Sequence, residues 1–485
     1  MIDTAALKNS ILDLAFQGKL TSQDSSDGCA EDLYNEICDE KSELIKLGKI
    51  KKNKIIPIKD EDIPYSIPDN WKWIRWGDLS EKIQYGYNAP AKSEGRIKIV
   101  RISDIQDNTV LWDTVPYCEI EEEQIADYLL RENDILFART GGTVGKSYIV
   151  SDIPEDAVFA GYLIRTSYSN KLCSRYMKFF MESKLYWKQL RNGTIATAQP
   201  NCNGQTLSKM MVPLPPFTEQ LRIVATVEKA FEQIDKIDIL QVQYSSNLEV
   251  LKSKIIDAGI QGKLTEQLPE DGTAEELLKQ IVEEKKQIFK ERKGREDKNV
   301  KKLDDNVPYE LPENWKWIRF GEIGLFKKGP FGSALTKAMF VPKSDDTVKV
   351  YEQQHAIQKN SELGTYYITR EYFDDKMSGF EVLPGDILVS CAGTIGETYI
   401  LPDDIEQGII NQALMRVSLV PSVNKRFFQY YFDANLKKTA QEESNGSAIK
   451  NIPPFDVMKN WYFALPPYNE QVRIVEKLDE LLSLM

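Results

Sequence analysis

The amino-acid sequence predicts an α+β protein in which two mixed α/β domains, related by a pseudo-two-fold axis, are separated by long helices. Three observations lead to this fold class. The chain has 485 residues, too many for one core at roughly 100–200 residues per domain. It contains an internal repeat of long period. Between the two copies, apolar residues recur with the spacing of a long amphipathic helix.

The internal repeat consists of four blocks that each occur twice. The blocks are LKNSILDLAFQGKLT (7–21) with LKSKIIDAGIQGKLT (251–265), IPYSIPDNWKWIRWGDL (63–79) with VPYELPENWKWIRFGEI (307–323), NDILFARTGGTVGKSYIV (133–150) with GDILVSCAGTIGETYIL (385–401), and LPPFTEQLRIV (214–224) with LPPYNEQVRIV (465–475). The shift is 244 residues for the first two blocks and 251 or 252 for the others. This change indicates insertions between blocks, so the two domains share a scaffold and carry different surfaces.

A long helix is predicted to follow the first domain. Thr218 is a natural N-cap after two prolines, and Asn469 repeats the arrangement near the C-terminus. Apolar residues then recur at three or four positions, which predicts a seam for a partner helix in an antiparallel coiled coil. A helix over 218–259 would be about 60 Å long at ~1.5 Å per residue. The alternative is an amphipathic helix that packs on its own domain.

The two ends of the chain together complete this helical unit. The C-terminus carries its beginning, LPP-EQ-RIV, and the N-terminus carries its end, LKxxIxD-QGKLT. Position 485 corresponds to about 234 in the central copy and position 1 to 245, so about ten residues are missing at the join. We therefore expect adjacent termini and a circular arrangement of the chain.

The remaining elements follow in order along each copy. Thr273 and Glu276 form a capping box ahead of a short helix, and 28–47 is the earlier counterpart, with Cys29 at the capping position. Strands are predicted at the NWKW segments and at 98–102, 134–138 and 147–150, and helices at 174–191 and 424–438. The predicted domains are an N-terminal helical region (1–58), a first mixed domain (59–216), a central helical region (217–302), a second mixed domain (303–467) and a C-terminal helix (468–485).

Composition excludes several classes of function. The chain is 42% hydrophobic and 28% charged, as in soluble globular proteins, and no apolar run approaches the ~18–20 residues of a membrane span, so we predict a cytoplasmic location and no membrane partner. Six cysteines without a C-x-x-C pair predict neither a zinc cluster nor a redox dithiol. With one histidine, His355, catalytic Ser/His or Cys/His sets and multi-histidine metal sites lack their parts. We predict no catalytic residue and no metal ligand.

Two motifs approach catalytic patterns without matching them. TGGTVGKS (140–147) resembles a phosphate-binding loop but has Thr140 where glycine is required, and its second copy lacks the lysine. A glycine turn between strands is the better interpretation. NIPPF (451–455) resembles the N-P-P-F loop of amino-methyltransferases, but Ile452 splits the motif, and no glycine-rich turn for AdoMet follows a strand.

Net charge is −12, from 62 basic and 74 acidic residues, so a DNA-binding surface must be local. Residues 165–209 hold eight bases and one acid, and the matching window 416–464 holds seven bases and four acids. The first window mixes aromatic residues with bases suited to phosphate contact, namely Lys171, Arg175, Lys178, Lys184, Lys188 and Arg191. A solvated helix face is the alternative.

In these blocks the sequence resembles the specificity subunit of type I restriction-modification systems over essentially its whole length. The motifs that carry the resemblance are the paired LPP-EQ-RIV, NWKWIR, GTVG/GTIG and QGKL segments. The resemblance implies two target recognition domains that each read half of a split site on double-stranded DNA. It also implies two modification subunits with AdoMet for adenine-N6 methylation, and one or two restriction subunits with ATP and Mg. No cofactor is expected on this chain.

Candidate DNA contacts are polar or aromatic residues near glycine turns or strand ends, where arginine suits guanine and glutamine suits adenine. They are Tyr87, Lys92, Arg101, Arg139, Thr140 and Lys146 in the first domain, with Lys327, Lys328, Ser333, Gln353, Gln354 and His355 in the second.

The resemblance thus implies a sequence-specific DNA-binding subunit that directs methylation and restriction by its partners in phage defence, and the lack of catalytic motifs agrees with a non-enzymatic role. Because KIVRISDIQDN (98–108) differs from KVYEQQHAIQKN (349–360), the two half-sites should differ and the site should be asymmetric. Their centres should lie about one helical turn apart, roughly 10 bp. The alternatives are an interaction scaffold of two domains on a coiled coil without a DNA role, and an enzyme with an unrecognised site.

Overall fold

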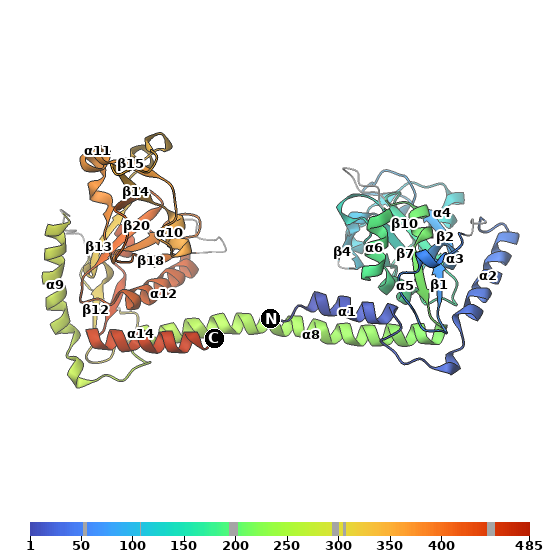
Figure 1. Ribbon diagram of the computed structural model, residues 1–485, viewed down its shortest axis with the longest axis horizontal. Coiled ribbons are helices and arrows are strands. Elements are labelled where there is room, and N and C mark those ends of the chain that lie inside the picture. Colours follow the sequence, from blue (N-terminus) through green and yellow to red (C-terminus); the bar gives the residue numbers. More distant parts are fainter. Residues whose placement is uncertain (52–55, 107, 194–201, 293–299, 304–306, 444–451) are drawn as a thin grey trace. The chain divides into compact units, whose positions relative to one another are not determined.

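The computed structural model describes residues 1–51, 56–106, 108–193, 202–292, 300–303, 307–443 and 452–485. The chain divides into two compact units, Met1–Gln243 and Tyr244–Met485, and Figure 1 shows sheets and helices in each of them. The division falls inside one helix, α8, which spans Phe217–Ile260. Each unit is therefore described by itself.

The first unit contains α1 to α7, β1 to β11 and the beginning of α8. The bounds are α1 Thr4–Phe16, α2 Ala30–Lys46, β1 Lys72–Arg75, α3 Trp76–Leu79, β2 Ser80–Tyr85, β3 Ile97–Val100, β4 Ile105–Gln106, β5 Thr109–Val110, β6 Tyr117–Cys118, α4 Glu122–Tyr128, β7 Ile135–Ala138, β8 Ser147–Ile149, β9 Ala157–Phe159, β10 Leu163–Tyr168, α5 Ser174–Phe180, α6 Lys184–Gly193, α7 Gly204–Lys209 and β11 Met211–Leu214.

The second unit repeats much of this order. The bounds are α9 Ala274–Glu291, β12 Lys316–Arg319, β13 Gly324–Lys328, β14 Thr347–Tyr351, α10 Gln353–Gln358, β15 Tyr367–Thr369, α11 Arg370–Tyr372, β16 Glu381–Val382, β17 Ile387–Ser390, β18 Thr398–Ile400, β19 Gly408–Ile410, β20 Leu414–Leu419, α12 Lys425–Glu443, α13 Phe455–Met458, β21 Tyr462–Leu465 and α14 Tyr468–Ser483.

The main sheets follow the same strand order in both units, while the sheet with the parallel pair is β6-β3-β9 in the first unit and β15-β14-β19-β16 in the second. An antiparallel sheet has the order β2-β10-β7-β8 in the first unit and β13-β20-β17-β18 in the second. A second sheet contains one parallel pair, β3 with β9 or β14 with β19, and a two-stranded ribbon joins β1 to β11 or β12 to β21. The prediction of two repeated mixed α/β domains is confirmed.

The helical regions share the cores of the domains that they adjoin. In the first unit, the Phe16 ring of α1 lies 5.3 Å from the ring of Tyr176 and 5.5 Å from that of Phe180. In the second unit, Leu478 of α14 and Ile281 of α9 are buried in one cluster with the domain's Phe320. Figure 1 also shows α1 lying along α8 within the first unit.

The predicted helices are present, with corrections at their ends. The helix predicted at 218–259 is α8, and the capping box of α9 forms between Thr273 and Glu276 as predicted. The N-caps predicted at Thr218 and Asn469 were wrong, because α8 begins at Phe217 and α14 at Tyr468. The preceding proline pair holds an extended backbone up to the helix, so Pro467 itself takes the N-cap position of α14.

The predicted helix at 174–191 is two helices, α5 and α6. The Ser183 hydroxyl between them accepts a hydrogen bond from the Tyr186 backbone N–H at 3.2 Å, as an N-cap does. A serine that caps the second helix starts a new one, which hydrophobic periodicity alone did not reveal.

The two QGKL turns end their helices in the same way. Gly18 and Gly262 have φ of +67° and +69°, in the left-handed region that favours glycine. A Cβ would lie 2.4 Å from Pro68 Cγ in the first turn and 2.5 Å from Pro312 Cγ in the second. The repeated glycine and the repeated IPxNW segment are therefore explained by one contact, in which the turn packs on the start of the domain.

Candidate nucleic-acid interface

In the first unit, three loops meet at one end of the strands of the β2-β10-β7-β8 sheet, which we call the loop edge. They follow β2, follow β7 and precede β10. The Tyr87 N–H donates to Phe159 O at 2.7 Å, and the Gly161 N–H donates to Tyr87 O at 2.9 Å. The Arg139 N–H donates to Tyr162 O at 3.2 Å, and its guanidinium lies 4.7 Å from the centre of the Tyr85 ring. Three sequence-predicted contacts, Tyr87, Arg139 and Thr140, are thus on neighbouring loops.

The side chains of the other candidates near this edge have partners of their own. The Tyr87 ring packs edge-on against Tyr128 at 5.2 Å, inside a small core cluster. The Arg101 guanidinium donates to both Asp104 oxygens at 3.0 and 2.7 Å, and this interaction raises the pKa of Arg101. Lys92 is exposed, with its ammonium 3.8 Å from a Glu119 oxygen. Reading DNA through Arg101 would require it to leave Asp104.

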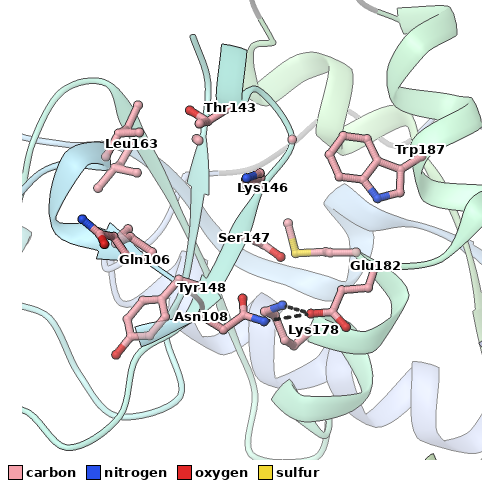
Figure 2. Close-up of a pocket in the computed structure, with 15 residues that line it drawn as sticks. Gln106, Asn108, Thr143, Lys146, Ser147, Tyr148, Leu163, Lys178, Glu182 and Trp187 are labelled. Atoms are coloured by element: carbon pink, nitrogen blue, oxygen red, sulfur yellow. Dashed lines mark hydrogen bonds and ion pairs between the residues drawn. The ribbon is translucent and has the colours of Figure 1, made fainter. Parts of the chain in front are cut away.

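Lys146 differs from these candidates because it lines a cleft of about 520 Å³ beside the β7–β8 turn. The cleft lies between residues 102–106 with Asn108, the β7–β8 turn and the helices α5 and α6, and Figure 2 shows Lys146 among its lining residues. Glu182 accepts from Lys178 and, at 3.4 Å, from Asn108. Across the described part of the chain, no carboxylate pairs with the exposed Lys146 ammonium.

In the second unit, residues 353–359 occupy the corresponding place and bond directly to the β17–β18 turn. Gln353 Nε2 donates to Ala392 O and, at 3.2 Å, to Thr394 O. The Lys359 ammonium lies 2.7 Å from both Glu397 Oε2 and Thr398 O. Gln353 is thus already bonded to the scaffold.

The remaining candidates of the second unit differ in exposure. Lys327 and Lys328 are exposed at the end of β13, with the Lys327 ammonium 4.8 Å from the centre of the Phe380 ring, and Ser333 is exposed in the following loop. Gln354 Nε2 donates to Glu352 Oε2 at 2.9 Å. Lys328 and Ser333 are the more available pair, because both are exposed, and in the described residues neither forms an ion pair with a carboxylate.

The prediction of His355 as an exposed base contact was wrong. Its side chain has 0% exposure, Nδ1 accepts from the Glu352 N–H at 2.8 Å, and Nε2 donates to Leu363 O at 2.6 Å. Burial lowers the pKa of His355. Asp104 makes the matching bond in the first unit, where its Oδ2 accepts from the Arg101 N–H at 2.8 Å. His355 therefore takes the place of a buried aspartate that forms the turn. Alignment of the two copies of the sequence already pairs His355 with Asp104.

The basic window at 165–209 is partly neutralised by ion pairs. Lys171 pairs with Glu36 of α2 at 2.7 Å, and Lys184 pairs with Asp13 of α1 at 2.7 Å. The other paired bases are Arg165 with Asp134, Arg175 with Glu228 and Lys178 with Glu182. Five of the eight bases are thus paired, and three of them, Lys171, Arg175 and Lys184, join the domain to helices α2, α8 and α1. The matching window, 416–464, lies partly outside the described residues.

Two exposed aromatic residues on these edges were missed by sequence reasoning. Tyr162 is 66% exposed next to Arg139, and Phe331 is 89% exposed after β13. Single exposed apolar side chains are common on protein surfaces, so the interest of these two rings lies in their position beside Arg139 and after β13. Their position beside loop glycines, at 161 and 332, was the available signal.

The motif that resembles a phosphate-binding loop has an ordinary structural role. TGGTVGKS forms the turn between β7 and β8, as predicted for a glycine turn. NIPPF begins at 451, outside the described residues. Within the described ranges, no group of three or more His, Cys, Asp or Glu residues is arranged to hold a metal ion. None of the helices found there is long and apolar enough to cross a membrane.

Comparison with known proteins gives consistent matches. Residues 68–244 and 312–485 match the family model described as the type I restriction modification DNA specificity domain. The EcoEI specificity subunit of Escherichia coli is 24% identical over 560 residues, covering 99% of this chain and 89% of that protein. The EcoAI specificity subunit of Escherichia coli is 23% identical over 540 residues, covering 98% and 88%.

Two solved structures share the fold. A chain from the type I R-M system has a TM-score of 0.57 at 19% identity, covering 87% of this chain and 92% of that one. The HsdS subunit from Thermoanaerobacter tengcongensis has a TM-score of 0.51 at 17% identity, covering 87% and 91%. At this identity the likeness supports the arrangement of repeated mixed domains rather than any contact with a ligand.

Proposed function

Because the chain belongs to the type I restriction modification DNA specificity family, we propose that it reads the DNA site for a type I restriction-modification complex. Each mixed domain would recognise one half of a split site on double-stranded DNA. The observation that carries this proposal is the contrast between one repeated scaffold and two different loop edges. A scaffold protein that did not recognise a DNA sequence would not need different residues at the corresponding turns of its two domains.

The two edges differ enough for the site to be asymmetric. Lys146 in the β7–β8 turn corresponds to Glu397 in the β17–β18 turn, and Tyr85 corresponds to Lys328 in strand register. Direct readout depends on donors, acceptors and charge at base edges. We therefore propose unlike half-sites, with their centres about one helical turn apart, roughly 10 bp.

We also propose that the helices form an antiparallel coiled coil and that the chain is circularly arranged, with adjacent termini. Support comes from the antiparallel order of bonds between α1 and α8, where Thr4 bonds to Asp238 at 2.7 Å and Lys8 to Asp235 at 2.6 Å. Further support comes from the turn after α1, which makes the same contacts as the turn after α8.

The proposed partners supply the chemistry. Two modification subunits would bring AdoMet and methylate adenine at N6, and one or two restriction subunits would bring ATP, Mg and cleavage. This chain would bind no cofactor and would act in the cytoplasm.

The proposal is tested by mapping N6-methyladenine in DNA treated with this chain, its modification subunits and AdoMet. We expect one asymmetric split site. Exchanging 63–213 for the equivalent domain of a relative should change one half-site and leave the other half and the spacing intact. A palindromic site, or a swap that changes both halves, would contradict the modular proposal. Absence of salt-dependent duplex binding by the complex would favour the scaffold alternative.

A further inference from the structure

A buried carboxylate lies in the first turn of the helix that follows each domain. Glu219 of α8 and Glu470 of α14 both have 0% exposure. An ionised carboxylate without partners is costly to bury, so its oxygens must be fully hydrogen-bonded. The partners of these two groups identify what they do in the fold.

In the first unit, Glu219 joins three segments of the chain. Its Oε2 accepts from Trp71 Nε1 at 2.8 Å, just before β1 of the domain. Its Oε1 accepts from Gln23 Nε2 at 2.7 Å and from Thr21 Oγ1 at 3.1 Å, in the turn after α1. One planar group therefore links the start of α8, the start of the domain and the turn that ends α1.

The second unit repeats this arrangement oxygen by oxygen. Glu470 Oε2 accepts from Trp315 Nε1 at 2.8 Å and from Asn314 Nδ2 at 3.4 Å. Its Oε1 accepts from Gln267 Nε2 at 2.9 Å and from Thr265 Oγ1 at 3.2 Å, in the turn after α8. We call each set of contacts the domain–helix junction.

Residues next to each glutamate form further hydrogen bonds that hold the first turns of α8 and α14. Three positions after each glutamate, Arg222 donates to both oxygens of Asp27 at 2.7 and 2.5 Å, and Arg473 to both of Asp271 at 2.9 and 2.6 Å. Gln220 Nε2 donates to Pro215 O at 3.0 Å, while its Oε1 accepts from the Cys173 N–H at 2.9 Å. Directional bonds on several sides leave little freedom for the helix to tilt or roll against the domain.

We propose that Glu219 and Glu470 are positioning residues that fix the angle of each recognition domain on its helix and thereby set the number of base pairs between the half-sites. This inference rests on the proposed function. One base pair rotates a half-site by about 36° and moves it by about 3.4 Å, so a small change of this angle moves the preferred spacing. The half-site sequences, read at the loop edges, are set elsewhere in the domain.

The test compares two tryptophans of the same segment in the full complex with its modification subunits and AdoMet. Trp71→Phe removes the N–H that bonds to Glu219 and keeps an aromatic ring. Trp73→Phe is the matched control, because Trp73 Nε1 donates to Tyr65 O at 3.2 Å instead. Trp315→Phe and Trp317→Phe form the same pair in the second unit, where Trp317 Nε1 donates to Tyr309 O at 3.3 Å. Glu219→Gln provides a second, stronger variant.

The readout is methylation of DNA that carries the native half-sites at the native spacing and at one and two base pairs more or fewer. We expect Trp71→Phe and Glu219→Gln to lower the preference for the native spacing over its neighbours by roughly 5-fold or more, on the scale of one charge-assisted bond. Trp73→Phe should retain the preference at a similar thermal stability. The half-site sequences should not change in any variant.

Equal loss of methylation at every spacing would overturn the positioning role, because it would leave the junction with a stabilising role alone. The positioning role would also be overturned if folded Trp71→Phe and Trp315→Phe showed the same dependence of methylation on spacing as the wild-type protein. If the wild-type complex methylates no split site at any spacing, the proposed function fails. That outcome is distinct from failure of the positioning role, in which the wild-type complex still methylates its site.

Discussion

The same edge of the two domains is open in the first unit and closed in the second. A cleft separates residues 102–106 and Asn108 from the β7–β8 turn, whereas Gln353 and Lys359 bond directly across to the β17–β18 turn. The charge at the turn is also inverted, with Lys146 in one copy and Glu397 in the other. Exposed loop positions can change chemistry freely because they form few bonds with the scaffold.

Buried positions behind the same edge keep their bonds even where the residue type changes. Lys98 donates to Trp112 O at 2.8 Å, and Lys349 donates to Ser361 O at 2.8 Å. Asp104 and His355 accept from the N–H three residues earlier, one through an oxygen and the other through a nitrogen. An unsatisfied buried polar group costs about 1–3 kcal/mol, so the bond is retained while the side chain is replaced.

The largest expected loss of stability tests whether the QGKL turns contribute equally to the two units. Gly18→Ala and Gly262→Ala should each destabilise their unit by about 2–5 kcal/mol, from the left-handed backbone and the overlap with a proline. Gly48→Ala is the control, because Gly48 ends α2 with the same backbone bonds as Gly18, has φ of +71° and has no atom within 4 Å of the added Cβ. It should cost only about 1–2 kcal/mol. Thermal unfolding measures all three, and equal losses for Gly18→Ala and Gly48→Ala would contradict the packing explanation.

His355→Ala should destabilise the second unit by about 3 kcal/mol, because it removes two buried hydrogen bonds and leaves a cavity. The wild-type contribution should also depend on pH. Because burial lowers the pKa of folded His355, the unfolded chain binds a proton first as the pH falls. Stability is then present in full above the unfolded pKa of about 6.5 and is lost below it, by up to ~1.4 kcal/mol per pH unit.

The control for this pH dependence is His355→Asn, since the chain has no other histidine. Chemical denaturation between pH 7 and 5.5 should show the decline in the wild-type protein and a flatter profile in the variant. Identical profiles would mean that His355 titrates alike in the folded and unfolded states.

Lys146→Ala should weaken binding of the complex to DNA by roughly 5–10-fold and reduce the slope of log affinity against log salt by about 1, as expected for one phosphate contact. Lys184→Ala is matched to it, because the Lys184 ammonium is paired with Asp13. Binding is measured over a salt series. A larger effect from Lys184→Ala would favour the basic window over the cleft as the DNA surface.

The smallest effect concerns the closed edge. The Lys359–Glu397 pair is partly exposed, with 46% and 44% of the two side chains accessible, so a double-mutant cycle should give only about 0.2–1 kcal/mol. Opening the pair should change DNA contact more than stability. Proteolysis of the loop after α10 in Lys359→Ala, compared with Lys337→Ala at an exposed lysine between β13 and β14, reports whether the edge has opened. Equal cleavage in both variants would show that the pair does not close it.

The sequence by itself determined the repeat, the two mixed domains and the long helix, because each depends on local order or on comparison of the chain with itself. Hydrophobic spacing located α8 to within one residue at each end, and the Thr273 capping box was readable from four letters. Sequence resemblance also led to the specificity family without any coordinates.

Only the tertiary structure decided which polar residues were available. Lys171 and Lys184 looked like a basic surface because their partners, Glu36 and Asp13, lie 135 and 171 positions away. His355 looked exposed because the bond to Leu363 O depends on how a loop folds back over it. Burial and pairing are properties of residues that are distant in the chain and close in space, so neither can be counted within a window of sequence.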